Sequence, residues 1–191
     1  TSQPGVFTYT VPGTAPCANA TATVTVSVTT APNAGTNGSI TVCSSQGAVN
    51  LFTLLGGTPS SGGTWTRPDG LAHSGSYLPG SQVGGNYTYT VAGTGPCANA
   101  TAVVQVVRII APNAGTNGTV TVCSTNAPFP LLSFLGGTPN GGGTWRGPGN
   151  VAFNGTFIPG TSPPGQYAYV VTGTSPCVND TGFVSVQVNT A

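Results

Sequence analysis

A segment of 80 residues occurs twice in succession in this sequence, and its final part occurs once more near the start. Asn-Ala-Gly-Thr-Asn-Gly begins at Asn33 and again at Asn113. Cys17 recurs as Cys97 and then as Cys177, at the same 80-residue spacing. Self-similarity at a fixed period predicts an array of similar structural units, and function in such arrays usually lies in the array rather than in one pocket.

The repeat divides the chain into three parts. Residues 31–110 and 111–191 are two full units, and residues 1–30 match only the last part of a unit, because Phe-Thr-Tyr-Thr at 7–10 aligns with Tyr-Thr-Tyr-Thr at 87–90. A domain that starts in its penultimate strand cannot enclose a core. We therefore expect the sequence to be an excerpt from a longer chain, or residues 1–30 to be completed by strands from a neighbour.

Short alternating segments recur along each unit. In the middle unit the predicted strands span 38–43, 62–67, 75–78, 86–91 and 101–110, and 49–55 is a short apolar run; Gly or Pro clusters separate these segments. Tyr87, Tyr89 and Val91 share one face of their segment, whereas Thr88 and Thr90 share the other, which is typical of a half-buried strand. No stretch has helical periodicity. The pattern predicts an all-β protein of tandem sandwich domains.

Ionisable groups are almost absent. The charged residues are Arg67, Arg108, Arg146, Asp69 and Asp180, and the only histidine is His73. None of these positions keeps its ionisable residue in the next unit, so the sequence predicts no enzyme, no metal site and no cofactor. Without a basic patch, the sequence predicts no nucleic acid binding, and no apolar run approaches the roughly 20 residues of a membrane-spanning helix.

The cysteines indicate disulfides and an oxidising, extracellular location. In a sandwich of the immunoglobulin type, strand B ends at the same pole as the F–G turn. If 38–43 is strand B and 93–97 is the F–G turn, Cys43 meets Cys97, and Cys123 meets Cys177. Cys17 would lie about 30 Å from the corresponding pole of the next unit, so its partner is expected outside the chain. The alternatives are five free thiols in a cytosolic protein and, less favoured, a zinc site.

Three further groups of residues are candidates for a role. Trp65 and Trp145, with Tyr89 and Tyr169, are expected in the cores, the alternative for the tryptophans being sugar stacking. The outer face of the last strand of the middle unit is apolar at Val103, Val107 and Ile109, which indicates either a contact with another unit or chain, or a slightly apolar surface. Seven Asn-x-Ser/Thr sequons are candidate glycosylation sites, although an Asn- and Thr-rich sequence also produces sequons by chance: Asn19, Asn37, Asn86, Asn99, Asn117, Asn154 and Asn179.

Several motifs resemble a known family. They are Asn-Gly-Ser-Ile-Thr-Val-Cys at 37–43, Leu-Leu-Gly-Gly-Thr-Pro at 54–59, Gly-Gly-Thr-Trp at 62–65, Gly-Asn-Tyr-Thr-Tyr-Thr-Val at 85–91 and Pro-Cys-Ala-Asn-Ala-Thr-Ala at 96–102. The series resembles immunoglobulin-like repeats of very large secreted surface proteins of Bacteroidota-type bacteria, often described as adhesin-like or gliding-motility-associated. The resemblance implies fold and location but no catalytic residue, and this chain is poorer in acidic residues than expected for such repeats.

These observations together favour an extracellular structural element, a stalk or filament on the cell surface. The expected partners are copies of the chain itself, assembled through strand complementation, and covalent glycans are possible additions. The alternative is an adhesin or carbohydrate-binding module, which exposed aromatic side chains in a groove would favour.

Overall fold

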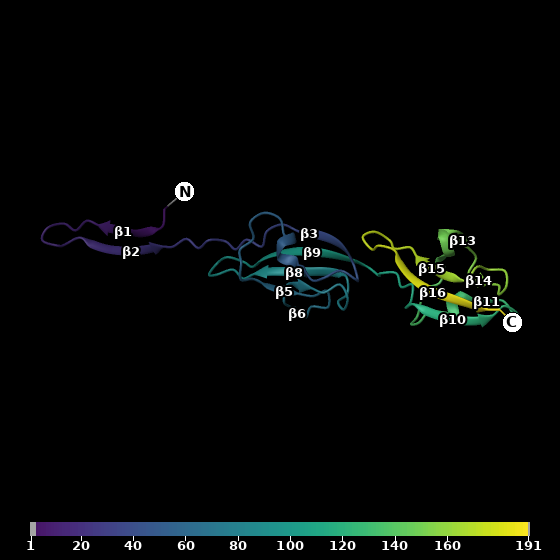
Figure 1. Cartoon of the computed structure of the whole chain (residues 1–191). Coiled ribbons are helices and arrows are strands. Elements are labelled where there is room, and N and C mark those ends of the chain that lie inside the picture. The colour runs from purple at the N-terminus through teal and green to yellow at the C-terminus, as the bar shows by residue number, and fades with distance from the viewer. Residues whose placement is uncertain (1–2, 191) are drawn as a thin grey trace.

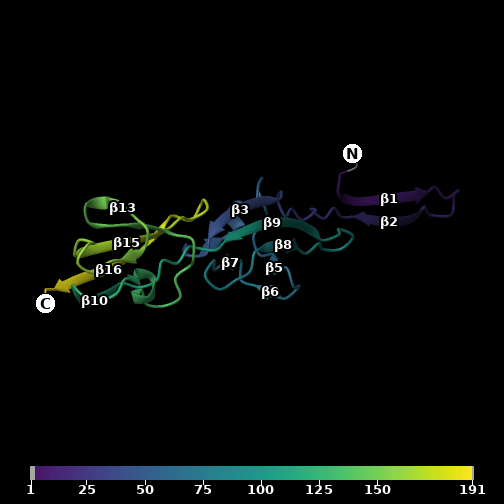
Figure 2. The same ribbon diagram turned by 90° about the vertical axis from the view of Figure 1, so that its right-hand side faces the viewer.

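The structure is a computed structural model that describes residues 3–190, and its regular secondary structure is mostly β-strand, as predicted (Figure 1). The N-terminal part is a single antiparallel hairpin of β1 (Gly5–Val11) and β2 (Ala20–Val26), with Gly5 opposite Val26 and Val11 opposite Ala20. The hairpin, the middle unit and the last unit follow one another along one direction in both views (Figures 1 and 2).

The middle unit contains one large and one small sheet. The large sheet has the order β3-β9-β8-β5-β6, and the small one pairs β4 with β7. A short 3₁₀ helix, η1, follows β4. The bounds are β3 Gly38–Cys43, β4 Val49–Asn50, η1 Leu51–Leu54, β5 Thr64–Thr66, β6 Ala72–His73, β7 Ser76–Tyr77, β8 Gly85–Val91 and β9 Ala100–Ile109.

The last unit repeats this arrangement. Its large sheet has the order β10-β16-β15-β12-β13, and its small sheet pairs β11 with β14. The bounds are β10 Gly118–Cys123, β11 Phe129–Pro130, η2 Leu131–Phe134, β12 Thr144–Arg146, η3 Pro148–Asn150, β13 Ala152–Phe153, β14 Thr156–Phe157, β15 Gly165–Val171 and β16 Asp180–Asn189.

The core of each full unit lies between its two sheets. In the middle unit, Tyr87 and Tyr89 from β8 pack with Val104 from β9, Tyr77 from β7 and the buried Leu51 of η1. The inward-facing side chains alternate with exposed ones along β8 and β9, as a strand with one buried face requires. The hydroxyl groups of Tyr77, Tyr87 and Tyr89 each donate a hydrogen bond to a main-chain carbonyl oxygen.

Two tyrosines fix loops to the core of the middle unit. The hydroxyl of Tyr87 donates to the carbonyl oxygen of Val83, four residues upstream, at 2.8 Å. This is the tyrosine-corner arrangement at the start of a strand. The hydroxyl of Tyr89 donates to the carbonyl oxygen of Ser60 at 2.7 Å and accepts from the amide of Gly63 at 2.8 Å. Tyr167 and Tyr169 make the equivalent bonds in the last unit.

One strand pairs differently from the sequence-based assignment. β3 was expected to be strand B of the sandwich, but it joins the large sheet and runs parallel to β9, with Gly38 opposite Val104 and Cys43 opposite Ile109. β10 pairs with β16 in the same way. Cys43 therefore lies where the chain leaves the middle unit, at the end of β9 farthest from the β8–β9 turn.

The hairpin resembles β8 and β9 in sequence but lacks the surroundings of these two strands. Tyr9 is 72% exposed, whereas Tyr89, 80 residues later, is 2% exposed. Val24 is 64% exposed, whereas Val104 is fully buried. Burying one large apolar side chain is worth about 1.5–3 kcal/mol, and an isolated two-stranded hairpin is marginally stable in water. The apolar face of β1 and β2 is thus a sheet face without a covering layer.

Candidate functional site: the junction between repeat units

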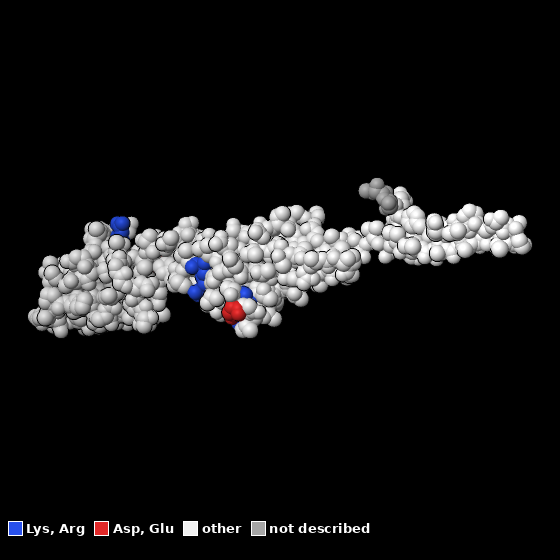
Figure 3. Space-filling model, turned by 180° about the vertical axis from the view of Figure 1, so that it is seen from behind, with Lys and Arg blue, Asp and Glu red and all other residues white. Residues whose placement is uncertain are grey.

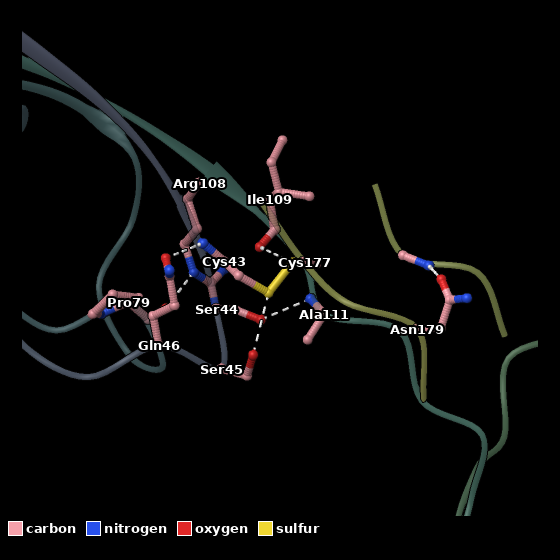
Figure 4. Close-up of a disulfide and its surroundings, with 11 residues drawn as sticks. Cys43, Ser44, Ser45, Gln46, Pro79, Arg108, Ile109, Ala111, Cys177 and Asn179 are labelled. Atoms are coloured by element: carbon pink, nitrogen blue, oxygen red, sulfur yellow. Dashed lines mark hydrogen bonds between the residues drawn. A yellow bond between two sulfur atoms is a disulfide. The ribbon is translucent and has the colours of Figure 1, made fainter. Parts of the chain in front are cut away.

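A disulfide joins the middle unit to the last unit. Cys43, at the end of β3, is bonded to Cys177, in the turn between β15 and β16, and their Cα atoms lie 5.0 Å apart (Figure 4). This separation is within the range of ordinary disulfides. The two cysteines are 134 residues apart in sequence, and both are buried.

The backbone around Cys43 is held by its own loop. The amide of Cys43 donates to the side-chain oxygen of Gln46 at 2.8 Å, and the amide of Gln46 donates to the carbonyl oxygen of Cys43 at 3.0 Å. The hydroxyl of Ser45 lies 3.2 Å from the sulfur of Cys43 (Figure 4). These contacts hold the sulfur of Cys43 at the exit pole, which is the end of the middle unit where the chain continues into the last unit.

Ser44 holds the connection between the two units. Its amide donates to the carbonyl oxygen of Ile109 at 2.8 Å, which continues the parallel pairing of β3 and β9. Its hydroxyl accepts from the amide of Ala111, the first residue of the last unit, at 2.9 Å. The sulfur of Cys177 lies 3.7 Å from the carbonyl oxygen of Ile109. Main chain, hydrogen bonds and disulfide therefore meet at one point.

The turn that carries Cys177 is built tightly. The amide of Gly173 donates to the side-chain oxygen of Asn179 at 3.0 Å, and the amide of Cys177 donates to the carbonyl oxygen of Thr174 at 2.8 Å. A Cβ atom at Gly173 would lie 2.4 Å from the carbonyl oxygen of Val178. Glycine is thus required at this position, and the equivalent turns at Gly13 and Gly93 have the same restriction.

The linker, Ala-Pro-Asn-Ala-Gly at 111–115 at the start of the last unit, is folded onto that unit. The amide of Ala114 donates to a carboxylate oxygen of Asp180 at 2.7 Å, and Ala114 is fully buried. The side chain of Asn113 donates to the carbonyl oxygen of Thr138 at 3.1 Å, and its main-chain oxygen accepts from the amide of Asn140 at 2.7 Å. A linker held at both ends leaves few bonds about which the units can rotate.

The expected pairing of Cys43 with Cys97 and of Cys123 with Cys177 is wrong. Because β3 runs parallel to β9, Cys43 and Cys97 lie at opposite poles of the middle unit, about 30 Å apart for a ten-residue strand. The turn of the next unit is the cysteine-bearing segment that reaches Cys43. The pattern of alternating residues identified the strand correctly but could not specify its neighbour in the sheet.

The remaining cysteines are unpaired within residues 3–190, and each is a repeat equivalent of a bonded one. Cys97 and Cys17 correspond to Cys177, and Cys123 corresponds to Cys43. Cys123 is partly exposed, whereas Cys43 is 1% exposed under the next unit. A hydrogen bond from the hydroxyl of Thr125, at 3.3 Å, lowers the pKa of the Cys123 thiol, as do smaller contacts with backbone amides and Ser124.

The ionisable side chains are engaged in structural contacts. Arg67 pairs with Asp69 at 2.7 Å within a turn, and the amide of Leu71 is the main cause of the lowered pKa of Asp69. The guanidinium of Arg108 donates to the main-chain oxygens of Pro79 and Gly80.

The other three ionisable residues are similarly placed. Arg146 donates to the carbonyl oxygen of Asn150, and Asp180 holds the linker. His73 accepts from the amide of Gly75 and lies beside Gln82. Figure 3 shows how sparse charge is on the face of the molecule that it draws. Residues 3–190 contain no cluster of three or more potential metal-ligating side chains of His, Cys, Asp or Glu.

The structure places the other candidate residues as follows. Trp65, Trp145, Tyr89 and Tyr169 lie in the two cores. On the outer face of β9, Val107 is exposed, Val103 is half-buried, and Ile109 lies at the junction. All seven sequon asparagines are exposed.

Six of the seven sequon asparagines also have a structural role in the structure. The side-chain oxygens of Asn19, Asn99 and Asn179 accept from the glycine amide of their turn. Asn37 and Asn117 accept from main-chain amides of β9 and β16, and Asn154 accepts from the amide of Thr156. The recurrence of these asparagines therefore has an explanation that does not require a glycan. The sequence alone does not reveal this role, because an asparagine that closes a turn and a glycosylation sequon have the same local pattern here.

Comparison with solved structures identifies the fold. The chain is similar to a three-immunoglobulin-domain segment of the titin I-band and to a variant of that segment in which glutamate is changed to alanine. In each case the TM-score is 0.58, the identity is 13%, and the match covers 97% of this chain and 75% of the other. The units are tandem immunoglobulin-like domains.

No protein-family model matches the sequence, and a search of curated proteins finds no match. At 13% identity the likeness to titin concerns the fold alone. Among the residues that the structure describes, no helix has the length and apolar character needed to cross a membrane.

Proposed function

We propose that the chain is a segment of an extracellular structural protein in which immunoglobulin-like units form a stalk or filament. The observation that supports this most directly is the disulfide between Cys43 and Cys177, which joins two successive units instead of closing one. A covalent bond in that position adds nothing to a binding pocket. It resists bending and separation of neighbouring units.

The junction provides stiffness through several connections acting together. The main chain passes from Ile109 to Ala111 beside the disulfide, and Ser44 bonds to both of these residues. To bend the last unit away from the middle unit, the hydrogen bonds of Ser44 must break, and the Cys43–Cys177 bond still limits the separation of the two units. The linker side is fixed by Asp180 and Asn113. An array built in this way transmits force along its length.

The proposed location is the outside of the cell. Disulfides persist in oxidising compartments, and the sequence motifs resemble repeats of secreted surface proteins of Bacteroidota-type bacteria. A net charge of +1 gives little repulsion between copies. The same proposal has two further parts. Copies of the chain associate through strand complementation, and glycans on the exposed sequon asparagines keep the surface hydrated.

The alternative of a carbohydrate-binding adhesin has less support. Stacking on a sugar needs an accessible aromatic ring, and both Trp65 and Trp145 are more than nine-tenths buried. Their rings pack against Tyr89 and Tyr169, with ring centroids 5.1 and 5.0 Å apart. The aromatic residues that the repeat preserves therefore serve packing.

Electron microscopy of the chain tests the mechanical role. The distribution of angles between the middle and last units is measured for the oxidised protein and for the Cys43→Ser/Cys177→Ser variant. We expect a narrow distribution for the oxidised protein and a clearly broader one for the variant. A Thr119→Ser variant, at an exposed position of β10, serves as the matched control and should keep the narrow distribution. Equally broad distributions in oxidised protein and variant would contradict the proposal.

A further inference from the structure

Two features of the N-terminal half have no partner among residues 3–190. The first is the apolar face of β1 and β2, which is exposed although the same face of β8 and β9 is buried. The second is the free thiol of Cys97, the repeat equivalent of the bonded Cys177. The second feature lies next to the segment that follows the first, because the sulfur of Cys97 is 3.7 Å from the carbonyl oxygen of Thr29, which comes after the end of β2 at Val26.

The geometry around Cys97 repeats that of the formed junction. The sulfur of Cys177 lies 3.7 Å from the carbonyl oxygen of Ile109, and Thr29 is the repeat equivalent of Ile109. In the formed junction, Cys43 is paired with Ile109 in the parallel ladder and bonded to Cys177. By equivalence with the formed junction, the position beside Thr29 corresponds to a cysteine that ends a strand parallel to β2.

We propose that one partner fills both positions: a repeat segment with the sequence pattern of residues 31–84, which carries the equivalents of β3 to β7 without its own final hairpin. Its first strand pairs in parallel with β2, its glycine opposite Val24 and its cysteine opposite Thr29. That cysteine forms a disulfide with Cys97. The inference deepens the proposed function, on which it rests, by naming the segment that joins the array here.

The other edge of the hairpin fits the same segment. In the middle unit β5 pairs with β8, and Trp65 lies opposite Tyr89. The equivalent strand of the partner would pair with β1 and place its tryptophan opposite Tyr9. The hydroxyl of Tyr9 would then donate to the carbonyl oxygen of the partner's Ser60 equivalent and accept from the amide of its Gly63 equivalent, as the hydroxyl of Tyr89 does in the middle unit. Edge-strand addition of this kind combines main-chain hydrogen bonds with side-chain pockets.

The covalent step is thiol–disulfide exchange. Glutathione disulfide oxidises the two thiols: one thiolate attacks it and releases one reduced glutathione, and the second thiolate then attacks the mixed disulfide and releases another. The protein gains one sulfur–sulfur bond, and the two electrons and two protons lost by the cysteines appear in the two glutathione thiols.

The test mixes the full chain, with its Cys43–Cys177 bond intact, with a separate polypeptide of residues 31–84 in glutathione buffer. We expect the cysteine of the fragment to be joined to Cys97 at least tenfold more often than to Cys17 or Cys123. Cys123 is itself an equivalent of the fragment's cysteine and should be a poor partner. Mass spectrometry of the cross-linked peptides measures the ratio.

Two variants of the full chain separate directed pairing from random oxidation. Tyr9→Asp changes an exposed side chain, so it should leave the other units folded but reduce cross-linking at Cys97 several-fold. Thr8→Asp, on the opposite face of β1, should leave the cross-linking unchanged. A fragment with Ile40→Asp and Val42→Asp keeps its cysteine but should lose the preference for Cys97.

Equal labelling of the three thiols, or cross-linking that Tyr9→Asp does not change, would overturn the proposal. Capture of a second full chain at Cys97 in preference to the fragment would also overturn it, because the occupant would then be a folded copy. None of these outcomes bears on the bending of the Cys43–Cys177 junction, so failure here is distinguishable from failure of the stalk proposal.

Discussion

At the scale of single residues, one side chain illustrates how each unit closes its core. Tyr89 contributes a buried ring to the core and a hydroxyl that serves two main-chain groups, the amide of Gly63 and the carbonyl oxygen of Ser60. Its burial and its hydrogen bonds have the same cause, because the loop of residues 56–63 folds over the ring. The equivalent Tyr9 has neither burial nor these bonds, since no such loop covers β1.

This difference gives a prediction with an internal control. Tyr89→Phe should lower the free energy of unfolding of the middle unit by about 1–3 kcal/mol, because it leaves part-buried polar groups without a partner. Tyr9→Phe should change stability by less than about 0.5 kcal/mol, since it is an exposed substitution. Chemical denaturation of both variants measures the difference. Equal effects would show that burial of the ring and its bonds is not what distinguishes the two positions.

At the scale of elements, the important feature is the parallel pairing of β3 with β9. It places Cys43 at the exit pole, while the β8–β9 and β15–β16 turns place their cysteines at the entry poles. One parallel strand therefore determines that the disulfide passes between units. The turn contributes by holding Cys177 in position through Asn179 and a glycine that has no space for a side chain.

The turn can be tested by a pair of glycine substitutions. Gly173→Ala would place a Cβ atom 2.4 Å from the carbonyl oxygen of Val178, so the turn must distort and move Cys177 away from Cys43. We expect the fraction of refolded protein with this disulfide to fall at least several-fold in glutathione buffer. Gly141→Ala is the matched control, because nothing lies within 4 Å of its Cβ position. An unchanged fraction for Gly173→Ala would show that the turn geometry is not required.

The sequence predicted the strands better than their neighbours. Gly38–Cys43 forms a strand over the predicted residues, and Gly85–Val91 and Ala100–Ile109 lie within one residue of the predicted ranges. The alternation of apolar and polar residues indicates which residues form a strand and which face of that strand is buried. It does not report whether the neighbouring strand is parallel, because that depends on long-range pairing. The disulfide partners were missed for this reason.

At the scale of the whole molecule, low charge and covalent junctions act together. The sequence contains two acidic side chains and one histidine in 191 residues, so few side chains can change protonation between pH 7 and pH 3. Acid unfolding mostly reflects carboxylates that are ionised in the native state and become protonated. A chain with almost none should therefore be insensitive to acid.

The pH dependence follows from Asp69. Its pKa is lowered from the usual 3.8, chiefly by the amide of Leu71 and also by Arg67. A lowered folded-state pKa means that its contribution is complete above about pH 4 and is lost as the pH falls through the folded value. We expect a nearly constant melting temperature from pH 7 to pH 4 and a small decrease below, which Asp69→Asn should lack. A large decrease already at pH 5 would contradict this account.

The central claim is that the disulfide joins successive units, and trypsin can test it directly. The chain has three basic residues, Arg67, Arg108 and Arg146, and the bond after Arg67 is resistant because proline follows. With free thiols blocked before denaturation, digestion produces residues 1–108, 109–146 and 147–191. We expect non-reducing mass spectrometry to find 1–108 joined to 147–191, with 109–146 free and blocked at Cys123. A product in which 109–146 is joined to 147–191, while 1–108 is alone, would contradict the account.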